Sequence, residues 1–234
     1  MLVKGIKRTQ GKSYKKPKRK PITPNVLNTI HHNLFTSDRC EQDKLMIWAA
    51  LLTAFFGFLR VSEYTSSHKT KFDEDTTLLV EDVYIHTLHA NITIKASKTD
   101  PFRQGVCVRI SRNNTTLCPI NALLQFLRVH PTSKGPLFTF NNGKYLSKRD
   151  VNKILRETTH NAIGVSSHSL RIGAASTAAA MGCPKWLIQR MGRWSSECFK
   201  EYIRIPTRMI DKTSRALSRC RVNIDKPYQP MSPP

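Results

Sequence analysis

A nearly continuous apolar segment, residues 45–59, places the strongest constraint on how this chain can fold. Apart from Thr53, its side chains would be apolar on every side of a helix, which predicts a central helix that is buried all round. The segment is shorter than the roughly 18 apolar residues that a membrane-spanning helix needs. It ends at Arg60, which snorkels, pairs with Glu63 or is held for an anion, because arginine is rarely buried without a partner. We favour the anion.

The charge of the chain indicates a polyanionic partner. Its 234 residues include 38 Lys and Arg against 16 Asp and Glu, a net charge of +22. This balance favours binding to a phosphate backbone, because each contact releases counterions. A membrane surface is the rival partner. We expect neither a spanning helix nor a secretory signal, because the sequence shows no sufficiently long apolar run and its N-terminal residues show no apolar core with a cleavage site.

Residues 1–21 contain nine basic residues and no acid, and they are predicted to be a solvated basic linker. The run KKPKRK at residues 15–20 is either part of a flexible solubilising arm or a phosphate-tracking or nuclear-targeting segment. The six cysteines form no C-x-x-C pair. We therefore expect reduced, mostly buried thiols of an intracellular protein, and no zinc site.

Local patterns predict a mostly helical domain with a small antiparallel sheet. Thr23 and Pro24 are typical of a helix N-terminus, and Ser147 with Asp150 forms a capping box. Three alternating segments with short connections predict antiparallel strands at residues 78–86, 89–96 and 105–110. Helices are expected at residues 24–34, 37–56, 119–130 and 147–161 and within 166–204, with a short extended piece at 137–140.

Residues 166–204 hold the groups that are best suited to chemistry. His168 and Arg171 form an H-x-x-R arrangement on a helix rich in Ala and Gly, whose small side chains permit close packing. A Gly-Arg-Trp turn and Tyr202 follow, and Trp186 is expected in the core. A His and an Arg three residues apart are common on helix faces. Two cations or proton carriers, a polar turn and a phenol in one stretch suit reaction at a phosphodiester.

Three local signatures resemble the catalytic domain of the tyrosine recombinase (phage integrase) family. GFLRVSE at 57–63 resembles the first-arginine motif, with Glu63 at its acidic position, and HSLRIGAAS at 168–176 resembles the H-x-x-R motif. MGRWSSECFKEYIR at 191–204 resembles the turn and nucleophile segment. The residues of this last segment are most similar to those of recombinases of eukaryotic mobile elements, the DIRS-like and Crypton-like groups. The resemblance covers roughly residues 20 to 210.

The resemblance implies an α+β, mostly α-helical fold over residues 22–210, that of a tyrosine recombinase catalytic domain with a small three-stranded antiparallel sheet. Residues 1–21 would be the end of a missing upstream core-binding domain, and residues 211–234 a basic, then Pro-rich tail. The resemblance also implies a nuclear recombinase or integrase of a transposable element, bound to double-stranded DNA as a homo-oligomer, a tetramer, in a DNA synapse. It implies no cofactor, no metal and no membrane.

The family's roles carry over to matching residues. The resemblance implies that Tyr202 is the nucleophile that forms a 3′-phosphotyrosine, and that Arg60 and Arg171 fork the non-bridging oxygens. His168 assists the proton transfer or donates to the phosphate. Lys98, at the tip of the predicted hairpin, would protonate the departing 5′ oxygen, although a lysine at a hairpin tip can also simply be solvated.

The chain departs from the family at one position. Nine residues before Tyr202, where many members have His or Trp, it has Arg193, with Trp194 beside it. Either can fill the role, as a donor to the phosphate or as a wall that fixes the tyrosine. Two alternatives to a recombinase stay open: a type IB topoisomerase-like relaxer with the same chemistry, and a domesticated DNA-binding protein that keeps the fold without cleaving. The intact catalytic positions argue against the second.

Overall fold

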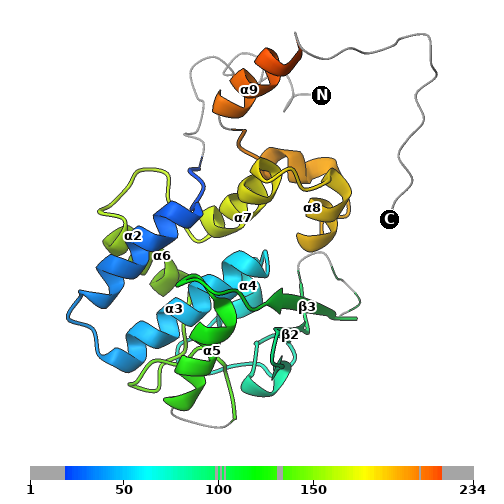
Figure 1. The fold of residues 1–234 in the computed structure, drawn as a ribbon. Helices are drawn as coiled ribbons and strands as arrows, with labels where there is room; N and C mark the ends of the chain where they lie inside the picture. Colours follow the sequence, from blue (N-terminus) through cyan, green and yellow to red (C-terminus); the bar gives the residue numbers. More distant parts are fainter. Residues whose placement is uncertain are drawn as a thin grey trace, which may run out of the picture. The chain divides into compact units, whose positions relative to one another are not determined.

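The computed structural model describes residues 19–97, 100, 102, 104–130, 134–205 and 207–217, in two compact units, Met1–Arg204 and Ile205–Pro234. The first unit is α+β and mostly helical, as predicted (Figure 1). Its elements in chain order are α2 (Pro24–Phe35), α3 (Glu41–Phe56), α4 (Val61–Tyr64), η1 (Val80–Asp82), β1 (Val83–Ile85), β2 (His89–Ile94), β3 (Val106–Ser111), α5 (Pro119–Arg128), α6 (Lys148–Thr158), α7 (His168–Ala180), α8 (Lys185–Met191) and η2 (Glu197–Tyr202).

Helix α3 is the centre of the first unit, as its apolar sequence predicts. Ten of its 16 residues are buried, and α2, α4, α5 and α7 all pack against it (Figure 1). It begins at Glu41 rather than near Ser37, because the Ser37 hydroxyl donates to the Leu34 carbonyl at 2.7 Å and closes the end of α2. No helix in the described ranges is long and apolar enough to cross a membrane.

Two helix starts follow their predicted caps. Helix α2 begins after Thr23, with Pro24 in its first turn. Before α6, the Ser147 N–H donates to Asp150 Oδ2 at 3.1 Å, and the Asp150 N–H donates to Ser147 Oγ at 3.3 Å. This reciprocal pair satisfies donors that a helix start otherwise leaves unpaired.

The three strands form an antiparallel sheet in the order β1-β2-β3. In its register Val83 pairs with Ile92, and Ile92 pairs with Val108. Every second residue of β2 is buried, as expected for a sheet with one face against the core. That packing includes contacts between β3 and α5.

The first predicted strand is shorter than expected. Of residues 78–86, the alternating pattern gives only β1, and the three residues before it form the 3₁₀ turn η1. Asp82 Oδ2 causes the difference, because it accepts the Leu79 N–H at 2.8 Å and pairs with Lys95 Nζ at 2.9 Å. A carboxylate that captures a backbone N–H three residues earlier stabilises a turn in place of a ladder.

Gly173 allows α7 to pack closely against the segment that precedes α2. A Cβ at Gly173 would lie 1.7 Å from the Ile22 carbonyl oxygen, far inside any real contact. The Ile22 N–H donates to the Ser169 carbonyl at 3.0 Å, and the Lys20 N–H donates to the Gly164 carbonyl at 2.9 Å. The small residues of α7 therefore permit close packing, as the sequence predicts, and they fix where its N-terminal end lies.

Three further features differ from the sequence expectations. Trp186 is 64% exposed and not in the core, because the seven-residue helix α8 buries only Ile188. Among the cysteines whose burial the structure describes, Cys118 alone is buried. The second unit contains α9 (Thr207–Leu217), a helix that we did not predict in this basic segment.

Gly173→Ala should destabilise the first unit. The added methyl group forces Ile22 and α7 apart, and overpacking of this kind costs about 1–3 kcal/mol. The free energy of unfolding in urea measures the loss. Thr177→Ala, half-buried on the same helix, is the control and should change stability little; equal stability of both variants would contradict the packing that we describe.

Candidate active site

Arg171 lies buried at the centre of the site although it carries a charge. It follows His168 by three residues on α7, so both occupy one helix face. Arg171 is 1% exposed, and its terminal nitrogens donate to the carbonyls of Phe58 and Gly192. Its guanidinium carbon lies 4.4 Å from the ring centroid of Trp194, a cation–π contact. Burial is the main cause that lowers the pKa of Arg171 to about 9, which leaves it charged at neutral pH.

The carbonyls that hold Arg171 belong to the C-terminal ends of two helices. Gly57 caps the C-terminus of α3 and Gly192 that of α8, and the next residue in each case, Phe58 or Arg193, has a positive φ of 50° or 54°. This left-handed residue is typical of the Schellman helix end. Helix C-termini carry partial negative charge. Arg171 therefore sits where two helix dipoles favour a cation.

Glu63 holds two other arginines together. Its fully buried carboxylate accepts from the guanidinium and the backbone N–H of Arg60, both at 2.8 Å, and from Arg193 at 2.6 Å. Burial opposes its ionisation, but Arg193 and Arg60 outweigh that effect, and the pKa of Glu63 lies below its usual value. The Arg60–Glu63 pairing that the sequence offered as an alternative is thus present. It does not neutralise the site, because Glu63 is shared.

The cluster of Arg60, Arg171, Arg193 and Glu63 has an excess of positive charge. Three guanidinium groups surround one carboxylate, which leaves two positive charges. The Nε–H groups of Arg171 and Arg193 are buried and find no hydrogen-bond partner among the described residues. A buried unpaired donor costs about 1–3 kcal/mol. Such a cluster suits an anion with several oxygens.

Tyr202 lies against this cluster, half-buried at the end of η2. Its ring centroid is 4.9 Å from that of His168 and 5.0 Å from that of Trp194, and the Arg171 guanidinium carbon is 5.9 Å from it. Arg193 and Trp194 are both candidates for the family's His or Trp position, and Trp194 is the one that packs against Tyr202. Arg193 points to Glu63 instead.

His168 is surrounded by cations. Burial, followed by four nearby positive groups, lowers the pKa of His168 to about 4. The imidazole is therefore neutral at pH 7. It can accept a proton at one ring nitrogen while the other ring nitrogen donates a hydrogen bond. The four cations, largest effect first, are Arg19, Arg171, Arg60 and Lys148.

Ser176 fixes the backbone on either side of Ile203. Its hydroxyl donates to the Tyr202 carbonyl at 3.1 Å and accepts the Arg204 N–H at 2.9 Å. Sequence reasoning missed this residue. The available signal was its place on α7, eight residues after His168 and hence on the same helix face.

The structure brings together six of the seven predicted site residues. The seventh, Lys98, lies outside the described residues, so its role stays a prediction. Among the residues that the structure describes, no group of three or more His, Cys, Asp and Glu is placed to hold a metal ion. The six are Arg60, His168, Arg171, Arg193, Trp194 and Tyr202.

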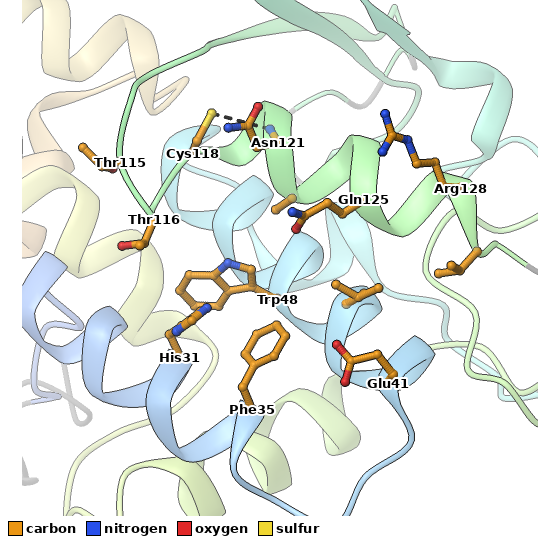
Figure 2. A pocket seen from close by; sticks show the side chains of 13 residues that line it. His31, Phe35, Glu41, Trp48, Thr115, Thr116, Cys118, Asn121, Gln125 and Arg128 are labelled. Atoms are coloured by element: carbon orange, nitrogen blue, oxygen red, sulfur yellow. Dashed lines mark hydrogen bonds between the residues drawn. The ribbon is translucent and has the colours of Figure 1, made fainter.

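A separate cavity of about 560 Å³ lies among α2, α3 and α5. Figure 2 shows His31, Phe35 and Trp48 gathered on one side of it, facing polar residues of α5. Its charged lining residues, Glu41 and Arg128, include one of each sign. It shares no lining residue with the arginine cluster and has no excess of cations, so it is not the candidate site for phosphate chemistry.

Comparison with known proteins finds matches of the fold but not of the sequence. No protein-family model and no curated protein matches the chain. Solved structures do match. The XerH site-specific recombinase bound to palindromic difH substrate, in a post-cleavage complex, superposes with a TM-score of 0.63 at 12% identity, covering 87% of this chain and 55% of that one. XerA recombinase gives 0.61 at 16% identity, covering 89% and 67%. The Tn1549 transposon integrase (residues 82–397), in complex with circular intermediate DNA, gives 0.55 at 13% identity, covering 88% and 68%.

These likenesses define the class of fold. The mostly helical unit with its three-stranded antiparallel sheet is the fold of tyrosine recombinase catalytic domains, which confirms the fold prediction. The chain spans little more than half the length of the XerH recombinase.

Glu63→Gln should destabilise the protein by about 3 kcal/mol, because it leaves two partly buried arginines, Arg60 and Arg193, without their anion. The pKa of Glu63 is lowered by folding, so its contribution is present above the usual pKa of a glutamate and is lost as pH falls through the lowered value. Unfolding free energies of wild type and variant should thus converge in acid. Glu157→Gln, which removes an exposed ion pair with Arg39, is the control and should cost under about 1 kcal/mol. Equal losses in the two variants would contradict the buried role of Glu63.

His168 should titrate far below an ordinary histidine. NMR titration of its ring protons, assigned by their absence in His168→Gln, should give a midpoint near 4 in the DNA-free protein. Because folding favours the neutral ring, His168 should also reduce stability as pH falls from about 6.5 towards 4. A midpoint near 6.5 would show that the imidazole is neither desolvated nor close to the four cations.

Proposed function

We propose that this chain is a DNA strand transferase of the tyrosine recombinase family, which cleaves and rejoins DNA through a 3′-phosphotyrosine at Tyr202. The observation that carries the proposal is the pair of arginines on the buried Glu63 carboxylate, together with buried Arg171 against Trp194. Beside them, a phenol lies between His168 and Trp194. The shared fold and the recombinases among the matching structures support it.

The arginines act on the charge that develops at phosphorus. In-line attack places more negative charge on the non-bridging oxygens, and fixed cations that need no reorganisation stabilise it best. Arg60 and Arg171 are the arginines that the family motif assigns to these oxygens. Arg193 acts through Glu63, since it shares that carboxylate with Arg60 and so limits how far Arg60 is neutralised.

The nucleophile and its proton acceptor are adjacent. The phenolic oxygen of Tyr202 attacks phosphorus, the bond from phosphorus to the 5′ oxygen breaks, and one phosphodiester replaces another. His168 is neutral because burial and neighbouring cations lower its pKa, so its free nitrogen can take the phenolic proton. Trp194 limits movement of the Tyr202 ring. The leaving oxygen becomes a 5′-hydroxyl with a proton from Lys98.

The biological setting is part of the proposal. The segment GRWSS…YIR resembles DIRS-like and Crypton-like recombinases, and a transposon integrase is among the matching structures. We therefore infer the recombinase of a mobile element, which acts in the nucleus as a homo-oligomer, a tetramer, on double-stranded DNA. Strand exchange between two duplexes, tested against relaxation of a supercoiled plasmid, separates this function from that of a topoisomerase-like relaxer.

Tyr202→Phe should bind DNA normally and form no covalent adduct with a nicked suicide duplex. The ring still packs between His168 and Trp194, but the attacking oxygen is gone. Denaturing gels of protein mixed with labelled duplex detect the adduct. Tyr145→Phe, a half-buried tyrosine outside the site, should give the wild-type yield. An adduct of normal yield in Tyr202→Phe would assign the nucleophile to another residue.

Lys98→Ala should block cleavage of ordinary DNA. The variant should still cleave a substrate in which sulfur replaces the 5′-bridging oxygen. Sulfur leaves without a proton, so the loss of a general acid no longer matters. Single-turnover rates on the two substrates measure the rescue. A variant equally slow on both would indicate that Lys98 positions DNA or is only solvated.

A further inference from the structure

A second cavity borders the candidate nucleophile Tyr202 and is not lined by Arg60, Arg193 or Glu63. It has a volume of about 260 Å³ and is lined by Arg19, His168, Ile172, Glu201, Tyr202 and Arg204. Two of its walls, His168 and Tyr202, are thus shared with the candidate active site. Arg19 helps to lower the pKa of His168, but the reaction described above places neither Arg19 nor Arg204 on the phosphate.

Arg19 is held at this cavity by its backbone. On its C-terminal side, the N–H groups of Lys20 and Ile22 donate to the carbonyls of Gly164 and Ser169 at 2.9 and 3.0 Å. The close approach of Ile22 to α7 depends on the missing Cβ of Gly173. Arg19 is exposed, and the hydrogen bonds of the adjacent backbone place it next to the start of α7.

The charges at the cavity favour an anion. Arg19 and Arg204 contribute two positive charges and Glu201 one negative charge, and His168 is neutral at pH 7. In the described part of the chain, neither Arg19 nor Arg204 forms an ion pair. Arg204 donates from one terminal nitrogen to the Glu201 and Ile203 carbonyls, while its buried Nε finds no partner there.

We infer that Arg19 and Arg204 form a second phosphate subsite, which binds the phosphodiester next to the scissile one on the cleaved strand. The inference rests on the proposed function, because it takes Tyr202 as the residue at the scissile phosphate. The cavity shares His168 and Tyr202 with that site, so we assign it to the neighbouring phosphate of the same strand. A guanidinium can fork two phosphate oxygens. The subsite would fix the strand on one side of the reacting phosphorus, and the arginine cluster would fix it at that phosphorus.

Neutral phosphates test the subsite one position at a time. Duplexes that carry a single methylphosphonate at each phosphate around the cleavage site are bound to the Tyr202→Phe protein, with and without Arg19→Ala. Arg19→Ala should weaken binding to normal DNA about tenfold and should lower the salt slope by about 0.9, the value for one phosphate contact. A methylphosphonate at the phosphate next to the scissile one should weaken DNA binding by the Tyr202→Phe protein. It should hardly weaken binding further in the protein that also carries Arg19→Ala.

Arg156→Ala is the matched control, because it removes an exposed arginine of α6 that does not line this cavity. It should show no coupling to any single phosphate. Arg19→Gln, which keeps a polar but shorter and uncharged side chain, should reproduce Arg19→Ala if charge is the cause. Circular dichroism confirms that each variant is folded.

The outcomes separate this inference from the proposed function. If the losses of binding free energy from the methylphosphonate and from Arg19→Ala add at every position, Arg19 contacts none of the phosphates tested. The proposed subsite is then wrong, whether or not Tyr202 forms an adduct. If wild type forms no adduct but one phosphate couples to Arg19, the subsite stands as a DNA contact and the proposed chemistry fails. Coupling at the phosphate next to the cleaved bond, together with an adduct at Tyr202, is the result that we expect.

Discussion

The shared carboxylate of Glu63 is the interaction on which the site depends. A buried carboxylate is costly without partners, and buried arginines repel each other without an anion. Glu63 accepts from both Arg60 and Arg193, so one group satisfies two cations and still leaves an excess of positive charge. Full neutralisation would remove the attraction for phosphate, and no carboxylate at all would leave the arginines too unfavourable to bury. One carboxylate among three guanidinium groups lies between these extremes.

The ends of two helices complete this arrangement. Phe58 and Arg193 have left-handed backbone conformations, which cost non-glycine residues about 1 kcal/mol each or more. They turn the chain so that carbonyls at the ends of α3 and α8 face Arg171. Arg193 thereby also reaches Glu63, and Trp194 covers Arg171 and meets Tyr202. The two strained residues therefore lie where the segment that contains Tyr202 meets the arginines.

Much of the fold follows from local pattern, and less of the site does. The apolar residues 45–59 predict a central helix, and the Ser147–Asp150 capping box predicts the start of α6, because both depend on near neighbours. The shortened first strand and exposed Trp186 depend on tertiary contacts, and α9 was missed because basic composition hides its helical pattern. Motifs predicted six residues that the structure brings together. They did not predict that Arg193, 130 residues from Glu63, shares its carboxylate, because no local spacing encodes such a contact.

The most direct measurement is the chemical identity of the protein–DNA linkage. A suicide duplex should trap the wild-type protein, and mass spectrometry of the digested adduct should then find the nucleotide on the peptide that contains Tyr202, joined through a 3′-phosphate. That result would mean that the phenol between His168 and Trp194 attacks the phosphodiester held by the arginines. A linkage through another residue, a 5′-phosphate at Tyr202, or cleavage without any covalent intermediate would contradict the account.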